Sequence, residues 1–274
     1  MMPKHLALKY KKFKLIKFDK IEKLLFSIRS AIEKLNLDKI KIHKYESKNK
    51  NKVDPVTLYD LKIEKLISKK IKKIFPNHSI LGEETGLKSS KNSEYTWVID
   101  PIDGTKNLIL GIPLWGNLIG LYHNKNCIFS FANFPLMKKY YLGFGNNSYL
   151  YEKSLMKKKI KCNKKILKVK HAKIVANTIN TFKHSKILKL IKNHKGIFRI
   201  TNANAYNFCL LAEGKIDVII ESGLKKVDIL PLVAIIKNSG AIITDWNGKQ
   251  NFNTGKVLVS SNIRIHQQLL RIIR

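Results

Sequence analysis

Cysteine is scarce in this sequence, which places isolated thiols at Cys127, Cys162 and Cys209. They are odd in number and far apart, so they fit neither a disulfide framework nor a thiolate metal site, and we expect a cytoplasmic protein. The chain also lacks the run of about 20 apolar residues that spans a bilayer. Its lysine-studded start has neither the apolar stretch nor the small-residue cleavage site of a secretory signal. We therefore expect no membrane partner.

Acidic residues and arginine are also sparse. The 53 Lys and Arg outnumber the 19 Asp and Glu, which leaves a formal net charge of +34. Lysine supplies nearly all of this charge, whereas base-edge and bidentate phosphate recognition favours arginine. Lysine is spread along the whole chain with much isoleucine and asparagine, as an A/T-rich genome would produce. We expect no specific nucleic-acid partner, and a basic nucleic-acid-associated protein without catalysis is the alternative. The positive field would still attract a phosphorylated substrate at low salt.

The hydrophobic pattern is that of a mixed α/β protein. Apolar residues at three- and four-residue steps predict helices over 18–36 and 57–75, and the 44% hydrophobic content can form a sizeable core. Strand-like segments follow to about residue 150, and strand and helix signals then alternate to the end. We find no internal repeat. We therefore expect one domain over 1–274, with sub-halves of about 1–165 and 166–274.

A short segment, "VIDPIDGTKN", brings Asp100 and Asp103 within one turn of each other. Carboxylates that close stay ionised only when a cation lies between them. Pro101 fixes one backbone angle between the two, and Gly104 lets a ligand approach the backbone. Thr105 then begins a predicted helix, whose free N–H groups suit an anion. The alternative is that Asp-Pro and Asp-Gly only form a turn here.

Further carboxylates lie at the ends of other predicted elements: Asp60 in "VDPVTLYD", Glu83 in "LGEE" and Asp228 in "LKKVDILPLVA". Each by itself could be a helix cap or a solvated surface charge. Together they form an oxygen-only set of ligands, which favours Mg²⁺ over zinc. Mg²⁺ beside an anion-binding helix start is the arrangement that phosphate-ester hydrolysis requires.

Three motifs, "GEET", "WVIDPIDGTKN" and "VDILPLVAIIKNSGAIITDWNG", resemble in order and spacing those of the inositol monophosphatase-like family of Mg²⁺-dependent phosphatases. The resemblance runs from about residue 20 to the end. It implies an α/β fold that is a layered α-β-α-β-α sandwich of the inositol monophosphatase/fructose-1,6-bisphosphatase type. It also implies two or three Mg²⁺ ions, a small phosphorylated substrate and a homodimer.

The resemblance further implies roles for individual residues. Glu83, Asp100 and the carbonyl of Ile102 would hold the first Mg²⁺, and Asp100, Asp103 and Asp228 the second.

Glu83 would also count among the catalytic residues. Thr105, supported by Asp60, would orient the attacking water. The amides of Gly104 and Thr105 would cradle the phosphate.

The flanking segments "GIPLWGNLIGL", "IIESGLKKVD" and "GAIITDWNG" look most like the histidinol-phosphate phosphatase branch. Glu221 stands where family members place a carboxylate that contacts the substrate, and it suits either an ammonium or sugar-like hydroxyls; the alternative is a surface charge at a strand end. Asn204 replaces an acid of that branch, and Val227 replaces a usual aromatic. We expect hydrolysis of histidinol phosphate to histidinol in histidine biosynthesis. The alternative is inositol 1-phosphate or another sugar phosphate.

Overall fold

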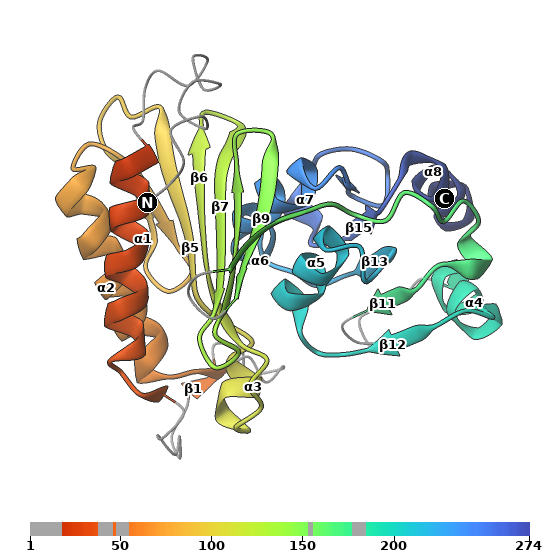
Figure 1. The fold of residues 1–274 in the computed structure, drawn as a ribbon, viewed down its shortest axis with the longest axis horizontal. Coiled ribbons are helices and arrows are strands. Elements are labelled where there is room, and N and C mark those ends of the chain that lie inside the picture. Colours follow the sequence, from red (N-terminus) through yellow and green to blue (C-terminus); the bar gives the residue numbers. More distant parts are fainter. Residues whose placement is uncertain (1–17, 38–45, 48–54, 153–155, 177–184) are drawn as a thin grey trace.

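The computed structural model describes residues 18–37, 46–47, 55–152, 156–176 and 185–274. Two β-sheets form its framework, and helices lie outside and between them (Figure 1). A short antiparallel ribbon of β1 (Glu46–Ser47) and β2 (Pro55–Val56) accompanies them, in a region that the sequence predicts as an exposed loop. No helix in these ranges is long and apolar enough to cross a membrane.

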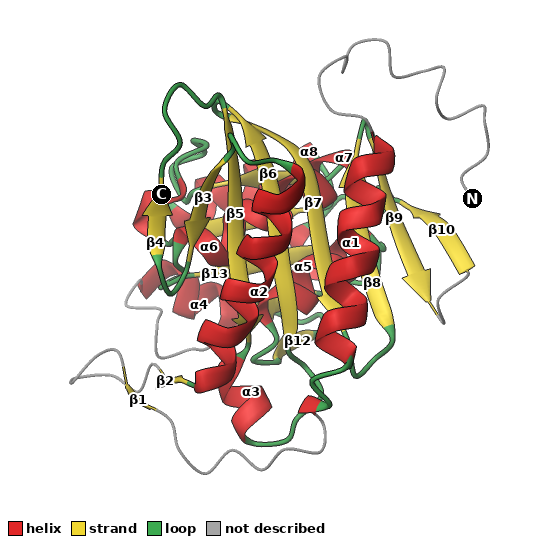
Figure 2. Ribbon diagram, turned by 90° about the vertical axis from the view of Figure 1, so that its left-hand side faces the viewer, coloured by secondary structure: helices red, strands yellow, loops and turns green. Residues whose placement is uncertain are grey.

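The larger sheet contains eight strands within the described ranges, in the order β10-β9-β8-β7-β6-β5-β3-β4. From β5 to β10 the chain forms an antiparallel meander, whereas β3 pairs with β5 in parallel. Figure 2 shows this sheet behind two helices. Its strands are β3 (Ser79–Gly82), β4 (Gly86–Lys88), β5 (Tyr95–Asp103), β6 (Gly116–His123), β7 (Asn126–Phe134), β8 (Lys139–Phe144), β9 (Asn147–Glu152) and β10 (Met156–Ile160).

Helices α1 (Phe18–Glu33) and α2 (Leu58–Ile74) cover one face of the larger sheet (Figure 2). Their apolar residues recur every three or four positions, and one stripe on each helix is therefore buried against the sheet. In α2 this stripe includes Ile63, Ile67 and Ile71, all of them inaccessible to solvent. The two helices predicted from the sequence are confirmed.

The smaller sheet has the order β12-β11-β13-β15-β14. Its strands are β11 (Ile174–Ala176), β12 (Phe198–Ile200), β13 (Val218–Glu221), β14 (Ile242–Thr244) and β15 (Val257–Ser260). Helices α4 (Ser185–Asn193) and α8 (Ile263–Ile273) pack on its outer face, together with the 3₁₀ turn Val169–His171. The expected boundary near residue 165 falls between the last strand of the larger sheet and the first strand of the smaller one.

Helices α5 (Asn204–Ala212) and α7 (Val233–Asn238) lie between the two sheets. The approach is close: a Cβ on Gly143 of β8 would collide with the backbone of Ala234 and Ile235 in α7. Three apolar clusters hold five layers together: one joins α1 and α2 to the larger sheet, one joins both sheets to the helices between them, and one joins α4 and α8 to the smaller sheet. The predicted α-β-α-β-α sandwich is confirmed.

The sequence predicts one helix from 228 to 239, but the structure divides it. A short helix α6 (Lys226–Ile229) is followed by the 3₁₀ turn Leu230–Leu232 and then by α7. Pro231 causes the break, because proline has no N–H to continue the α-helical ladder. The carbonyl of Leu230 accepts a hydrogen bond from the hydroxyl of Tyr122 in β6 at 3.1 Å, which anchors the break to the larger sheet.

Candidate active site

A bulge at the end of β5 brings Asp100 and Asp103 to the same side of the sheet. Residues three apart in a regular strand face opposite sides. Here Asp100 pairs with Leu118 and Asp103 with Gly116, so the three-residue step on β5 matches a two-residue step on β6. The extra residue of the bulge restores a common face. Asn117 stabilises it by donating its amide to the carbonyl of Pro101 at 2.7 Å.

Gly104 makes the turn from β5 into α3 (Thr105–Ile109). It has a φ of 87°, and a Cβ on it would lie 2.9 Å from the carbonyl oxygen of Leu114. Both the left-handed backbone and the close approach therefore require glycine. The N–H groups of the first turn of α3 have no partner within the helix. The predicted helix at Thr105 is confirmed.

The first turn of α2 holds Asp60 beside Thr105. Asp60 is 1% exposed and accepts from both the N–H and the hydroxyl of Thr57, at 2.7 and 2.6 Å. This capping arrangement aims its other oxygen, Oδ1, at the hydroxyl of Thr105, 3.2 Å away. The Thr105 hydroxyl also lies 3.1 Å from the carbonyl of Ile102. The pKa of Asp60 is raised overall. Burial is the main cause and the charge of Glu83 adds to it, whereas the hydrogen bonds to Thr57 and Thr105 lower the pKa by less.

Glu64, one turn after Asp60, is a site residue that the sequence reasoning missed. It is fully buried, and its carboxylate accepts from the N–H of Glu84 at 2.7 Å and from the N–H and hydroxyl of Thr85 at 3.0 and 2.6 Å. Glu64 thereby holds the turn that carries Glu83. An acidic residue within the apolar stripe of α2, four positions after Asp60, is the signal that could have identified it.

Four carboxylates from three segments lie close enough to influence one another. Burial and then the charges of Glu83, Asp103 and Asp228 raise the pKa of Asp100 well above its usual value.

Burial also raises the pKa of Asp103 and Asp228, each to about 7, with help from neighbouring carboxylates. Backbone N–H groups hold both residues: Ala205 donates to Asp103 at 3.1 Å and Lys225 donates to Asp228 at 2.7 Å. These shifts show that the cluster is short of positive charge.

The donor set fits Mg²⁺. All its side-chain atoms are carboxylate oxygens, and buried Oδ1 of Asp100 accepts no hydrogen bond from any described residue. Among those residues, however, no three acidic, histidine or cysteine side chains stand in the arrangement of ligands around one ion. Instead, the ammonium of Lys225 lies 3.0 Å from Oε1 of Glu83. The sequence reasoning missed this lysine as well, because a single lysine carries no signal among so many.

The predicted substrate residues lie in the half of the chain that carries Asp228. Glu221 ends β13 and is fully buried, so it is not a surface charge at a strand end. Asn204 is the first residue of α5, but its side chain lies outside the described part of the structure.

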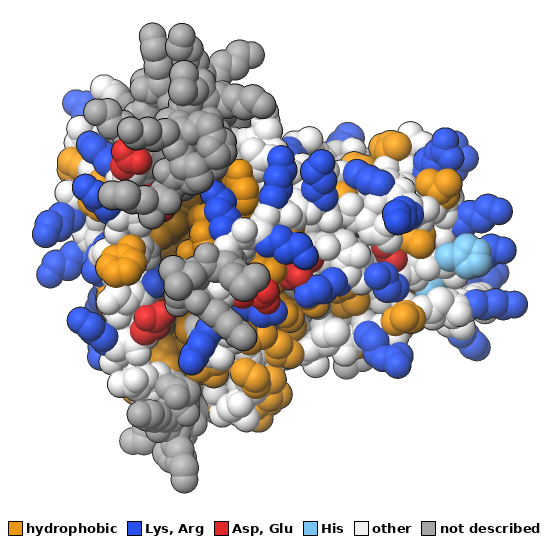
Figure 3. All heavy atoms as spheres, in the orientation of Figure 1, with side chains coloured by type: hydrophobic (Ala, Val, Ile, Leu, Met, Phe, Trp, Pro, Cys, Tyr) orange, Lys and Arg blue, Asp and Glu red, His pale blue; other side chains and the backbone are white. Residues whose placement is uncertain are grey.

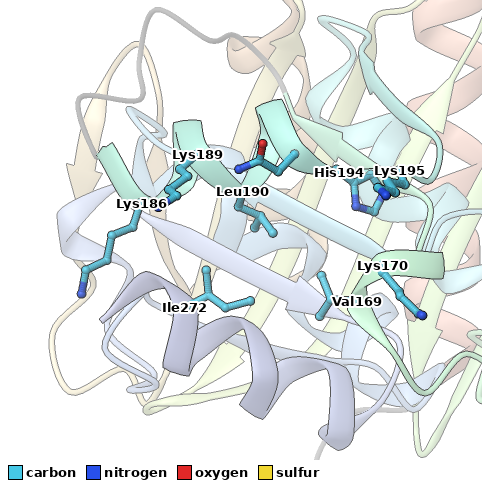
Figure 4. A pocket seen from close by; sticks show the side chains of 9 residues that line it. Val169, Lys170, Lys186, Lys189, Leu190, His194, Lys195 and Ile272 are labelled. Carbon is cyan, nitrogen blue, oxygen red and sulfur yellow. The ribbon is translucent and has the colours of Figure 1, made fainter.

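The basic side chains are not concentrated in one region of the visible surface. Lysine and arginine side chains are spread over both halves of the visible face and form no single stripe (Figure 3). A cavity of about 420 Å³ lies on the outer layer between α4 and α8 (Figure 4). It is lined by Val169, Lys170, Lys186, Lys189, Leu190, Asn193, His194, Lys195 and Ile272. It therefore belongs to a different part of the fold from the acidic site.

Known proteins resemble this chain in sequence and in fold. The chain is 32% identical over 264 residues to "Fructose-1,6-bisphosphatase/inositol-1-monophosphatase" of Aquifex aeolicus, covering 94% of this chain and 96% of the relative. It is 31% identical over 240 residues to "Bifunctional phosphatase IMPL2, chloroplastic" of Arabidopsis thaliana, covering 83% and 67%.

Among solved structures, an IMPase/NADP phosphatase complexed with Mg²⁺ and phosphate superimposes with a TM-score of 0.78 at 21% identity, covering 93% of this chain and 95% of the other. Residues 18–274 match the model of the inositol monophosphatase family. With this match, the two relatives and the five-layered fold in agreement, the chain belongs to the inositol monophosphatase family.

Proposed function

We propose that this protein is a Mg²⁺-dependent phosphomonoesterase acting on a small phosphate ester. The observation that carries the proposal is the largely buried carboxylate cluster, in which Asp100, Asp103 and Asp228 all have raised pKa values and Asp100 presents an oxygen without a hydrogen bond from the described residues. Such a cluster is stable in its ionised form only with added cations. Membership of the inositol monophosphatase family supports the same activity.

Glu83, Asp100, Asp103, Asp228 and the carbonyl of Ile102 are the residues that would hold the ions. When bound, Mg²⁺ would activate a water and neutralise the charge that develops on the leaving oxygen.

The chain itself would position that water through Thr105. The single hydroxyl hydrogen of Thr105 is directed to Asp60 or to the carbonyl of Ile102, which leaves the lone pairs of the oxygen to accept from water. Thr57 holds the carboxylate of Asp60 in place for this purpose. The backbone amides of Gly104 and Thr105, at the start of α3, would bind the phosphate oxygens.

We propose histidinol phosphate as the first substrate to test, with inositol 1-phosphate and other sugar phosphates as alternatives. The flanking motifs support the first, and the presence of Glu221 supports either, because a carboxylate binds an ammonium or hydroxyl groups. The Aquifex relative carries the names of fructose-1,6-bisphosphatase and inositol-1-monophosphatase, which supports the alternatives.

We extend the proposal to a single domain over 1–274, a homodimer with two or three Mg²⁺ per subunit, and a cytoplasmic location. Sedimentation of the purified protein measures the oligomer, and titration with Mg²⁺ measures the number of ions.

The decisive experiment compares the wild type with Asp100→Asn. The variant loses a charge that both ions would share, so we expect Mg²⁺-dependent phosphate release to fall by more than about a hundredfold while the fold persists. Phosphate release is measured with histidinol phosphate, inositol 1-phosphate, fructose 1,6-bisphosphate and 3′-phosphoadenosine 5′-phosphate, and circular dichroism checks the fold.

Asp19→Asn, on the exposed first turn of α1, is the matched control and should retain activity. Near-normal turnover by Asp100→Asn would contradict the metal mechanism. Absence of turnover by the wild type, with strong and salt-sensitive binding to RNA or DNA, would favour the nucleic-acid alternative instead.

A further inference from the structure

Lys225 joins the two halves of the acidic site. Its ammonium lies 3.0 Å from Oε1 of Glu83, across a separation of 142 residues in the chain. The side chain of Glu83 is 13% exposed and that of Lys225 is 44% exposed. The carboxylate is therefore enclosed, whereas the lysine reaches it from the solvent side.

The backbone of Lys225 is held independently of its side chain. Its N–H donates to Oδ2 of Asp228 at 2.7 Å, so the residue contacts two of the proposed metal-binding carboxylates at once. The preceding residue, Leu224, donates its N–H to the carbonyl of Gly255 at 3.2 Å. The base of the lysine is thus anchored at the start of α6, while its long side chain keeps a route to solvent.

The ammonium of Lys225 and a metal ion would compete for the same carboxylate. Mg²⁺ binds carboxylate oxygens at about 2.0–2.1 Å in a strict octahedral arrangement. A lysine ammonium at hydrogen-bond distance from that oxygen repels the incoming cation. Among the described residues, no three acidic, histidine or cysteine side chains are grouped as ligands of one ion, and one proposed ligand, Glu83, is paired with Lys225 instead.

We propose that Lys225 is a built-in, displaceable counter-cation of this site: its ammonium neutralises Glu83 until Mg²⁺ binds, and then leaves toward solvent. This inference rests on the proposed function, because it requires Glu83 to be a metal ligand. Lys225 is in this sense a positioning residue that sets how tightly Mg²⁺ is held. The competing interpretation is a permanent ion pair that serves only the fold.

Lys225→Met tests the proposal, because methionine retains much of the apolar stem and removes the charge. We expect calorimetric titration to show about three- to tenfold tighter Mg²⁺ binding by the variant, since one repelling charge is gone. We also expect its melting temperature to fall in the absence of Mg²⁺ and to match that of the wild type in saturating Mg²⁺.

The neighbouring Lys226→Met is the matched control, because Lys226 is also an exposed lysine in the first turn of α6. Its Mg²⁺ affinity should equal that of the wild type, and Lys225→Arg, which keeps the charge, should bind Mg²⁺ as weakly as the wild type does.

Equal or weaker Mg²⁺ binding by Lys225→Met, or a loss of stability that persists in saturating Mg²⁺, would overturn the proposal and support a permanent ion pair. Failure of the wild type to bind Mg²⁺ at all would instead contradict the proposed function, so the two failures are distinguishable in one titration.

Discussion

Single residues at this site are placed by local covalent and hydrogen-bond constraints. The bulge at Pro101 lets Asp100 and Asp103 share a face, and Asn117 holds it by one hydrogen bond. Gly104 then supplies a left-handed turn that no β-carbon could occupy without strain. The spacing of the motif therefore follows from the backbone as much as from the chemistry of its carboxylates.

Gly104→Ala should lower the free energy of unfolding by about 1–3 kcal/mol or more, because the left-handed φ and the contact with Leu114 both penalise a β-carbon. Gly111→Ala is the matched control: Gly111 also has a positive φ, of 72°, but its β-carbon would meet nothing within 4 Å. Urea unfolding measures both. Equal losses in the two variants would show that the carbonyl of Leu114 exerts no steric effect.

At the scale of elements, one turn of α2 organises two parts of the site. Asp60 faces Thr105, and Glu64, four residues later on the same face, holds the turn after Glu83. Gly143 in β8 likewise allows α7 to lie close to the larger sheet. Asp228 lies on α6, the short helix that precedes α7. A strand end carries Asp100 and Asp103, a short helix carries Asp228, and a turn held by α2 carries Glu83.

Glu64→Gln should weaken the turn, because a glutamine has one acceptor oxygen where the structure uses two. One donor, from Glu84 or Thr85, would then face an NH₂ group, at a cost of about 1–3 kcal/mol in unfolding free energy. Mg²⁺ affinity should fall as well, since Glu83 lies on the same turn and would lose its fixed position. Glu94→Gln, at an exposed ion pair with His123, is the control and should change neither quantity appreciably. Unchanged stability and Mg²⁺ binding in Glu64→Gln would remove Glu64 from the site.

At the scale of the whole molecule, the site lies where the two halves of the chain meet. Glu83 and Asp100 come from the larger sheet, whereas Asp228 and Lys225 come from the segment that leads into the middle layer. Carboxylates of both halves raise the pKa of Asp100: Glu83 and Asp103 from the first and Asp228 from the second. Closure of the five layers therefore creates the repulsion that the proposed Mg²⁺ ions would relieve.

The stabilisation by Mg²⁺ should depend on pH. Burial raises the folded-state pKa of Asp103 and Asp228 to about 7 from 3.8, so folding takes up protons between those values. Their contribution to stability is therefore greatest at low pH and is lost as the pH rises to about 7. Mg²⁺ needs the ionised forms, so the rise in melting temperature on adding Mg²⁺ should grow from about pH 6 to about pH 8.

Calorimetry with and without Mg²⁺ at each pH measures this rise. Half-buried His78 and buried His266, whose pKa values are lowered to about 4, titrate equally in both conditions and cancel in the difference. A Mg²⁺ effect of equal size at both pH values would contradict the assignment of Asp103 and Asp228 as ligands.

The amino-acid sequence by itself predicted most of the elements and the kind of ligand that the proposed site offers. The hydrophobic period predicts α1 and α2, and the acidic motif around Asp100 predicts an oxygen-ligand site, because both signals depend on residues close together in the chain. The break at Pro231 was also present in the sequence, although the apolar period around it favoured a continuous helix.

Only the tertiary structure added to the site residues that no sequence motif carries. Glu64 and Lys225 were not predicted, because a buried glutamate and one lysine among many acquire their roles from the backbone N–H groups and the carboxylate that packing brings to them. The raised pKa values have the same origin: burial and proximity of charges exist only when the five layers close. The local sequence pattern thus specifies the secondary structure and the side chains of each segment. Long-range packing specifies which hydrogen-bond partners and charges surround those side chains.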